Sequence, residues 1–88
     1  MNDVRFDREL DTSGLNCPMP LVKARKEVGA LETGQVLKVV STDRGSVKDF
    51  QGWAKVDKKV ELIGQETAGD EGAESYVHFV QRIDGKEA

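Results

Sequence analysis

The stretch Cys17-Pro18-Met19-Pro20 decides where the first helix of this chain begins, and it contains the only cysteine. Proline lacks an N–H group and has its φ angle held near the helical value, so it fits the first turn of a helix. A residue before proline is pushed towards extended conformations, which are typical of an N-cap residue. We therefore expect Pro18 to be the first helical residue and Cys17 to be the N-cap.

This position predicts a reactive thiol. The thiolate is the nucleophilic form of cysteine, and a helix N-terminus lowers the pKa of a thiol placed there. The two prolines remove two donors from the first turn, which leaves the N–H group of Met19 best placed to reach the Cys17 sulfur. The alternative is an inert structural cysteine, because free cysteines are often buried.

Length and cysteine content limit the class of protein. A chain of 88 residues is expected to form a single domain over residues 1–88, with an ordered core over about residues 5–84. One cysteine cannot form an internal disulfide, which fits a reducing cytoplasmic environment. One cysteine and one histidine, His78, cannot assemble a structural zinc site. We expect neither a metal nor another cofactor.

The termini and the net charge exclude further classes. Residues 1–11 are charged throughout, unlike a signal peptide, and no apolar run approaches the length of a membrane span. The formal net charge of −3 argues against direct nucleic-acid binding. We expect a monomer that acts away from membranes.

The charges are unevenly distributed. The first helix has a basic cluster of Lys23, Arg25 and Lys26 against Glu27 alone, whereas residues 61–76 contain five acidic residues and no basic one. The basic cluster is either a docking surface for an acidic partner or a solvated helix face in which Glu27 pairs with Lys23.

The remaining pattern predicts alternating strands and helices. Strands are expected over residues 4–12, 36–40, 60–67 and 75–83, and helices over residues 18–30 and from Ser46 onwards. Residues 36–40 are rich in β-branched residues and predict a central strand. The order β-α-β-α-β-β favours an α/β fold with one sheet covered by both helices on a single face.

Three details of this pattern are open to test. The first helix places Leu21, Ala24, Val28 and Leu31 on one apolar stripe. Ser46 and Asp49 form a capping-box-like start for the second helix, and Gly52 predicts that this helix is short. Alternation in the last strand assigns Val77, Phe79 and Ile83 to the core, and Tyr76, His78, Val80 and Arg82 to the other face. His78 is then expected to be exposed and not catalytic.

The motif Leu10-Asp11-x-x-Gly14-Leu15-x-Cys17-Pro18-x-Pro20 resembles the signature of the TusA-like (SirA-like) family of sulfur carriers. The resemblance covers roughly residues 10–83, and its other matching residues are Arg25-Lys26, Thr33-Gly34, Val36 to Val40 and Asp49-Phe50-x-Gly52-Trp53. It implies a two-layer α/β sandwich with a four-stranded mixed sheet and two helices on one face. It also implies that Cys17 carries sulfur as a persulfide, with Gly14, Pro18, Met19 and Pro20 supporting it.

The absence of a second cysteine fits a carrier. A loaded Cys17 has no neighbouring thiol to resolve it, so it must wait for a cysteine of another protein. The family resemblance implies a cysteine desulfurase or rhodanese as donor and a DsrE-like or other relay protein as acceptor. The pathway, whether tRNA thiolation, molybdenum-cofactor supply or sulfur oxidation, stays open at this point.

Two departures from the family pattern concern the choice of partner. Arg44 and Gln51 stand where family members often have proline, and both lie near the second helix. The alternative function is a noncatalytic regulatory module in which Cys17 senses oxidants, because a sensor also needs an accessible thiol of low pKa.

Overall fold

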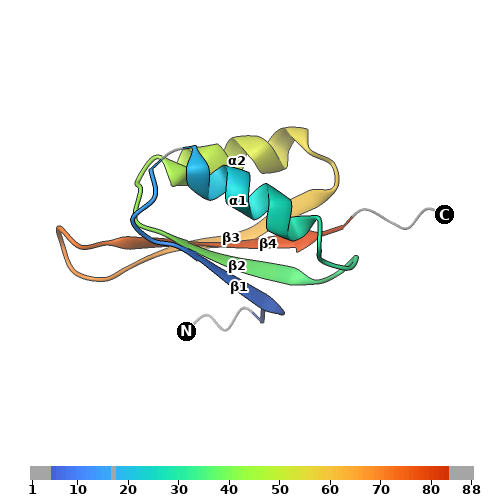
Figure 1. Ribbon diagram of the computed structural model, residues 1–88, viewed down its shortest axis with the longest axis horizontal. Helices are drawn as coiled ribbons and strands as arrows, with labels where there is room; N and C mark the ends of the chain where they lie inside the picture. The colour runs from blue at the N-terminus through green and yellow to red at the C-terminus, as the bar shows by residue number, and fades with distance from the viewer. Residues whose placement is uncertain (1–4, 17, 84–88) are drawn as a thin grey trace.

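The computed structural model describes residues 5–16 and 18–83, and its elements follow the predicted order (Figure 1). They are β1 (Arg8–Thr12), α1 (Met19–Val28), β2 (Val36–Ser41), α2 (Ser46–Val56), β3 (Val60–Ala68) and β4 (Ser75–Arg82). None of the helices in these residues is long and apolar enough to cross a membrane.

The four strands form one mixed sheet in the order β1-β2-β4-β3. β1 pairs with β2 in parallel, and β4 pairs antiparallel with both β2 and β3. Both helices cover the same face of this sheet (Figure 1). The two-layer α/β fold predicted from the sequence is therefore confirmed, and β2 is a central strand as expected.

The main core lies between the sheet and the helices. β2 contributes Leu37 and Val39, which are fully buried, and the helices contribute Ala24, Phe50 and Trp53. The predicted stripe of α1 is confirmed, because its members are buried or pack against this core: Leu21, Ala24, Val28 and Leu31. Amphipathic periodicity is thus sufficient to locate the buried face of α1.

The second helix begins at Ser46, as predicted, but not through a capping box. Gly45 occupies the N-cap position, and the Ser46 hydroxyl lies 2.9 Å from Nε2 of His78 in β4. The hydroxyl therefore bonds across the core instead of capping its own helix. Gly52 does not shorten α2, which continues for 11 residues because its apolar face is anchored by Phe50 and Trp53.

The predicted faces of β4 are confirmed in part: Val77 and Phe79 are buried as expected, but the predictions for His78 and Ile83 are wrong. His78 is 0% exposed and faces the helices, whereas Val77 and Phe79 lie on the helix-free face in a smaller cluster with Val36. Ile83 follows the end of β4 and is 42% exposed. Both alternating sets of β4 contain apolar residues, so alternation alone cannot decide which set the helices cover.

Candidate functional site

The loop before Cys17 is held by hydrogen bonds to its own strand and to the residue that follows β2. Gly14 has a φ angle of 86°, a left-handed conformation that suits glycine in a tight turn. Its N–H group donates to Oγ1 of Thr42 over 2.8 Å, and Leu15 N–H donates to the Thr12 carbonyl over 3.1 Å. These contacts fix the path of the chain up to Asn16.

Cys17 itself lies outside the described residues, and the residue after it corrects the predicted helix start. Pro18, not Cys17, occupies the N-cap position of α1, with φ −100° and ψ 16°. The Pro18 carbonyl accepts the first helical hydrogen bond, from Val22 N–H over 3.0 Å. The helix therefore begins one residue later than predicted, with Met19 as its first residue even though Pro20 disfavours a helical conformation there.

The Met19 N–H group, predicted to reach the Cys17 sulfur, has a partner within the turn. This group donates to the Asn16 carbonyl over 2.8 Å, so it is already satisfied within the turn. The side chain of Met19 is 42% exposed, whereas Pro20 is buried at the second helical position. Pro20 thus anchors the first turn in the core, and Pro18 and Met19 form its exposed part.

The three basic residues of the predicted cluster are all exposed on α1, but they do not all face the same way. Arg25 and Lys26 line a groove of about 410 Å³, and Lys23 does not. The predicted pairing of Glu27 with Lys23 is wrong, because Glu27 pairs with Arg8 of β1 over 2.8 Å. The cationic groups of α1 are therefore not neutralised by Glu27.

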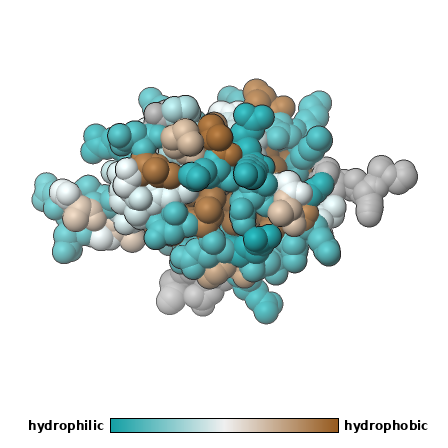
Figure 2. All heavy atoms as spheres, in the orientation of Figure 1, coloured by the Kyte–Doolittle hydropathy of each residue, from teal (hydrophilic) through white to brown (hydrophobic). Residues whose placement is uncertain are grey.

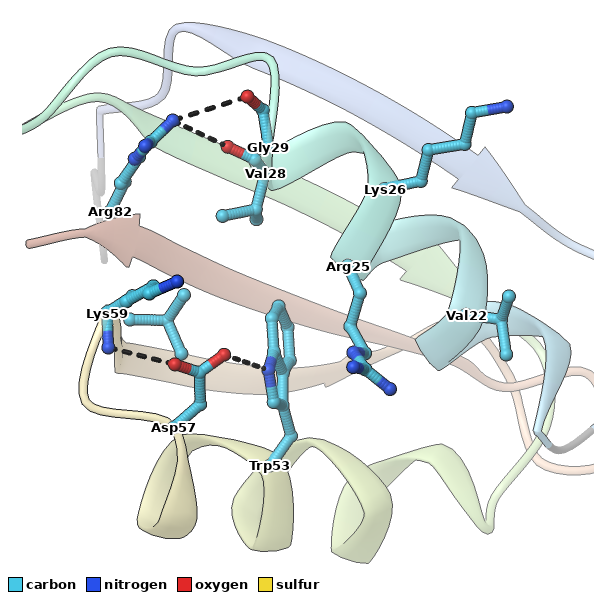
Figure 3. A pocket seen from close by; sticks show the side chains of 10 residues that line it. Val22, Arg25, Lys26, Val28, Gly29, Trp53, Asp57, Lys59 and Arg82 are labelled. Carbon is cyan, nitrogen blue, oxygen red and sulfur yellow. Dashed lines mark hydrogen bonds between the residues drawn. The ribbon is translucent and has the colours of Figure 1, made fainter. Parts of the chain in front are cut away.

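The groove lies between α1, the end of α2 and the last residue of β4 (Figure 3). Arg25 extends from α1 towards α2, and Trp53 extends from α2 towards α1. Lys59 and Arg82 also line it, so that four of its lining residues are cationic. Arg82 Nη1 donates to the carbonyls that end α1, at 3.3 Å for Gly29 and also to Leu31.

Asp57 is the acidic residue in this groove. Its carboxylate accepts hydrogen bonds from Lys59 N–H and from Trp53 Nε1, each over 2.9 Å. The bond from the Lys59 backbone lowers the Asp57 pKa most, and the Trp53 indole and the charges of Lys59 and Arg25 lower it further. Asp57 therefore stays ionised and holds the Trp53 ring in place, while the groove as a whole remains cationic.

Apolar side chains reach the surface of the helix layer beside this groove. Val22 of α1 is 47% exposed and Val56 of α2 is 77% exposed. Val56 lines a second, adjoining groove of about 540 Å³ together with Leu21 and Gly52. The space-filling view shows apolar atoms at the surface over the two helices, separated by hydrophilic ones (Figure 2). This combination of cations and scattered apolar groups suits contact with a protein.

Two parts of the site were not predicted from the sequence. Thr42 and its bond to Gly14 were not predicted, because the two residues are 28 positions apart and no motif links them. The contribution of Asp57, Lys59 and Arg82 to the groove was missed for the same reason. The short segment 57–59 contains both acidic and basic residues, and this mixture does not by itself indicate a binding site.

Comparison with known proteins gives a consistent result. The family model described as Sulfurtransferase TusA matches residues 8–82. The sulfur carrier protein TusA of Allochromatium vinosum is 60% identical over 50 residues, which are 57% of this chain and 66% of that protein. A putative sulfur carrier protein of Halobacterium salinarum is 40% identical over 80 residues, covering 91% of this chain and 94% of that protein.

The fold has a solved counterpart. The crystal structure of a SirA-like protein from Desulfitobacterium hafniense is similar, with a TM-score of 0.62 and 24% sequence identity. The similarity covers 84% of this chain and 96% of that chain. It supports the arrangement of two helices on a four-stranded sheet.

Proposed function

The chain belongs to the TusA family, and from this premise we propose that it is a sulfur carrier that holds sulfane sulfur as a persulfide on Cys17. The observation that supports this most directly is the family motif around the only cysteine of the chain. The putative sulfur carrier protein of Halobacterium salinarum aligns with 80 of the 88 residues, a stretch long enough to include this motif.

Loading is a thiol–persulfide exchange. The Cys17 thiolate attacks the outer sulfur of a donor persulfide, a new S–S bond forms at Cys17, and the donor leaves as a thiolate. Unloading repeats the step, with an acceptor thiolate attacking the outer sulfur of the Cys17 persulfide. Each step exchanges one S–S bond for another, so neither requires an added oxidant or reductant.

The donor in this proposal is a cysteine desulfurase or a rhodanese, and the acceptor is a DsrE-like or other relay protein. Transfer takes place in the cytoplasm, where a single thiol remains reduced. Lys23, Arg25 and Lys26 attract an acidic partner, and the grooves beside Arg25 receive its apolar side chains. The transferred sulfur is used for thiolation of tRNA, for synthesis of the molybdenum cofactor or in sulfur oxidation.

Intact mass spectrometry tests the proposal. After incubation with polysulfide or a loaded donor protein, the wild-type chain should gain the mass of one sulfur atom, and a reductant should remove it. The Cys17→Ser variant is the matched control, since it keeps a side chain of similar shape without the thiol. Equal gain of mass by the serine variant, or no gain by the wild type, would rule out the carrier function.

A further inference from the structure

The buried histidine of β4 has a defined hydrogen-bonding state. Nδ1 of His78 lies 3.1 Å from the amide nitrogen of Gln65, which also donates to the Val47 carbonyl over 3.1 Å. An amide nitrogen can only donate, so Nδ1 accepts and the ring proton resides on Nε2. Nε2 then donates to the Ser46 hydroxyl over 2.9 Å. His78 is therefore a neutral ring with both nitrogens used.

These contacts fix the first turn of α2 on the sheet. Ser46 and Val47 are the first two residues of α2, and both are held by the pair His78 and Gln65. One turn later, the Phe50 ring stacks on the imidazole with centroids 4.2 Å apart. The start of α2 is thus attached to β3 and β4 by hydrogen bonds as well as by apolar packing.

The start of α2 is attached in turn to the loop that precedes Cys17. Ser46 N–H donates to the Asp43 carbonyl over 3.0 Å, and Asp43 N–H donates to the Ser41 hydroxyl over 3.0 Å. Between them, Thr42 accepts the hydrogen bond from Gly14 N–H over 2.8 Å. A continuous set of contacts therefore runs from His78 through the β2–α2 loop to a residue three positions before Cys17.

We propose that His78 is a positioning residue for the loop that presents Cys17, acting through Ser46 and Thr42. This inference rests on the proposed sulfur-carrier function of Cys17. His78 holds the start of α2, α2 holds the β2–α2 loop, and the Thr42 hydroxyl of that loop holds the turn at Gly14. Loss of the His78 hydrogen bonds lets this loop move away from the turn.

The surroundings of His78 keep its ring in one orientation and one protonation state. The groups that face its ring belong to Ser46, Phe50 and Gln65, and none of them is charged. Burial lowers the His78 pKa to about 4, so the ring keeps its neutral state at neutral pH. A protonated Nδ1 would face the amide N–H groups of Gln65, and rotating that amide would place its oxygen against the Val47 carbonyl.

The test compares His78→Phe with Val36→Ala. Phenylalanine keeps a flat ring against Phe50 but cannot bond Ser46 or Gln65. Val36 is buried on the helix-free face at the other end of β2, so its truncation lowers stability without touching the β2–α2 loop. In His78→Phe, the Gly14 amide should exchange its hydrogen faster by about two- to tenfold, the factor expected from losing one hydrogen bond. The dependence of Cys17 alkylation on pH should also shift.

Further variants make the result decisive. Thr42→Val removes the acceptor of Gly14 and should reproduce the effects of His78→Phe on exchange and on alkylation, whereas Thr42→Ser should restore wild-type behaviour. If His78→Phe does not fold, Ser46→Ala takes its place in the comparison, because it removes the bond between His78 and the start of α2. If His78→Phe and Val36→Ala alter Gly14 exchange and Cys17 alkylation equally, the positioning role is overturned. Failure of the wild type to load sulfur would refute the proposed function instead, since the exchange comparison does not depend on loading.

Discussion

The imidazole ring of His78 lies flat against the Phe50 ring, with centroids 4.2 Å apart and an angle of 9° between their planes. A stacked, fully buried histidine is uncharged, and its burial lowers its pKa from 6.5 to about 4. This relationship makes the stability of the fold depend on pH between about 6.5 and about 4.

The first prediction concerns that dependence. Between pH 6.5 and pH 4 the unfolded chain binds the His78 proton more tightly, so the unfolding free energy rises with pH. The contribution is fully present above about pH 6.5 and decreases by about 3 kcal/mol as the pH falls to about 4. Denaturant unfolding at a series of pH values measures it. His78→Phe is the control, because it has the same carboxylates, and the difference between the two curves of unfolding free energy against pH isolates His78. Parallel curves for the two proteins would contradict the prediction.

The second prediction separates the groove from the rest of the basic cluster. Arg25→Gln removes a cation that lines the groove, whereas Lys23→Gln removes one that does not. Sulfur transfer to or from a partner protein should slow by about three- to tenfold in Arg25→Gln, the usual range for an interface charge, and less in Lys23→Gln. Added salt should reproduce part of the loss.

Polysulfide provides the control for these two variants, because it needs only the thiol. Its rate of loading should change little in either of them. Equal loss of both reactions would mean that Arg25 acts on the thiol itself. Equal slowing of protein transfer by the two variants would assign docking to the whole basic cluster.

The third prediction concerns Arg82. Its guanidinium donates to the carbonyl of Gly29, the C-cap of α1, and to that of Leu31 beyond the helix, so it caps α1 from β4. Arg82→Met should lower the unfolding free energy by about 1–3 kcal/mol, because it leaves these carbonyls without a charged donor. Lys48→Met makes a similar change at an exposed position of α2 and should stay within about 0.5 kcal/mol of wild type. Denaturant midpoints for the two variants give the comparison.

The fourth prediction contrasts two glycines. Gly52 lies within α2 with open space around its Cβ position, so Gly52→Ala should stabilise the protein by about 0.5–1 kcal/mol. Gly14 also has open space, but its φ angle of 86° is unfavourable for alanine. Gly14→Ala should therefore destabilise by about 1–2 kcal/mol. Thermal unfolding tests both, and a stable Gly14→Ala protein would mean that the turn can relax.

Short-range patterns were sufficient for the elements and the layers. The apolar stripe that includes Ala24 and Val28 located the buried face of α1, and the β-branched run of Val36 to Val40 located a central strand. In both cases one face or one short run is clearly more apolar than its surroundings. The order of the elements then limits the topology, because parallel strands need a helical connection.

Long-range contacts explain what the sequence did not predict. The sequence predicted Ser46 as a capping residue, but its hydroxyl bonds to His78, which is 32 positions away. The same bond explains why a polar residue of β4 occupies the covered face. At the site, the sequence predicted exposed cations on α1, but the groove depends on Asp57, Lys59 and Arg82 from later segments. The N-cap was predicted one residue too early, because Pro18 takes that position although its fixed φ angle also suits the first helical residue.

The loop before Cys17 and the groove beside Arg25 belong to the same small molecule, whose total accessible surface is 5595 Å². A typical protein partner covers on the order of 800 Å² of each chain, or roughly a seventh of this surface. α1 has 10 residues, so only about 15 Å separates its two ends. A partner centred on the turn before Cys17 would therefore also cover the groove and exclude a second partner from both. In the proposed carrier function, donor and acceptor would then take turns, and the rate at which the first complex dissociates would set an upper limit on the flow of sulfur through the chain.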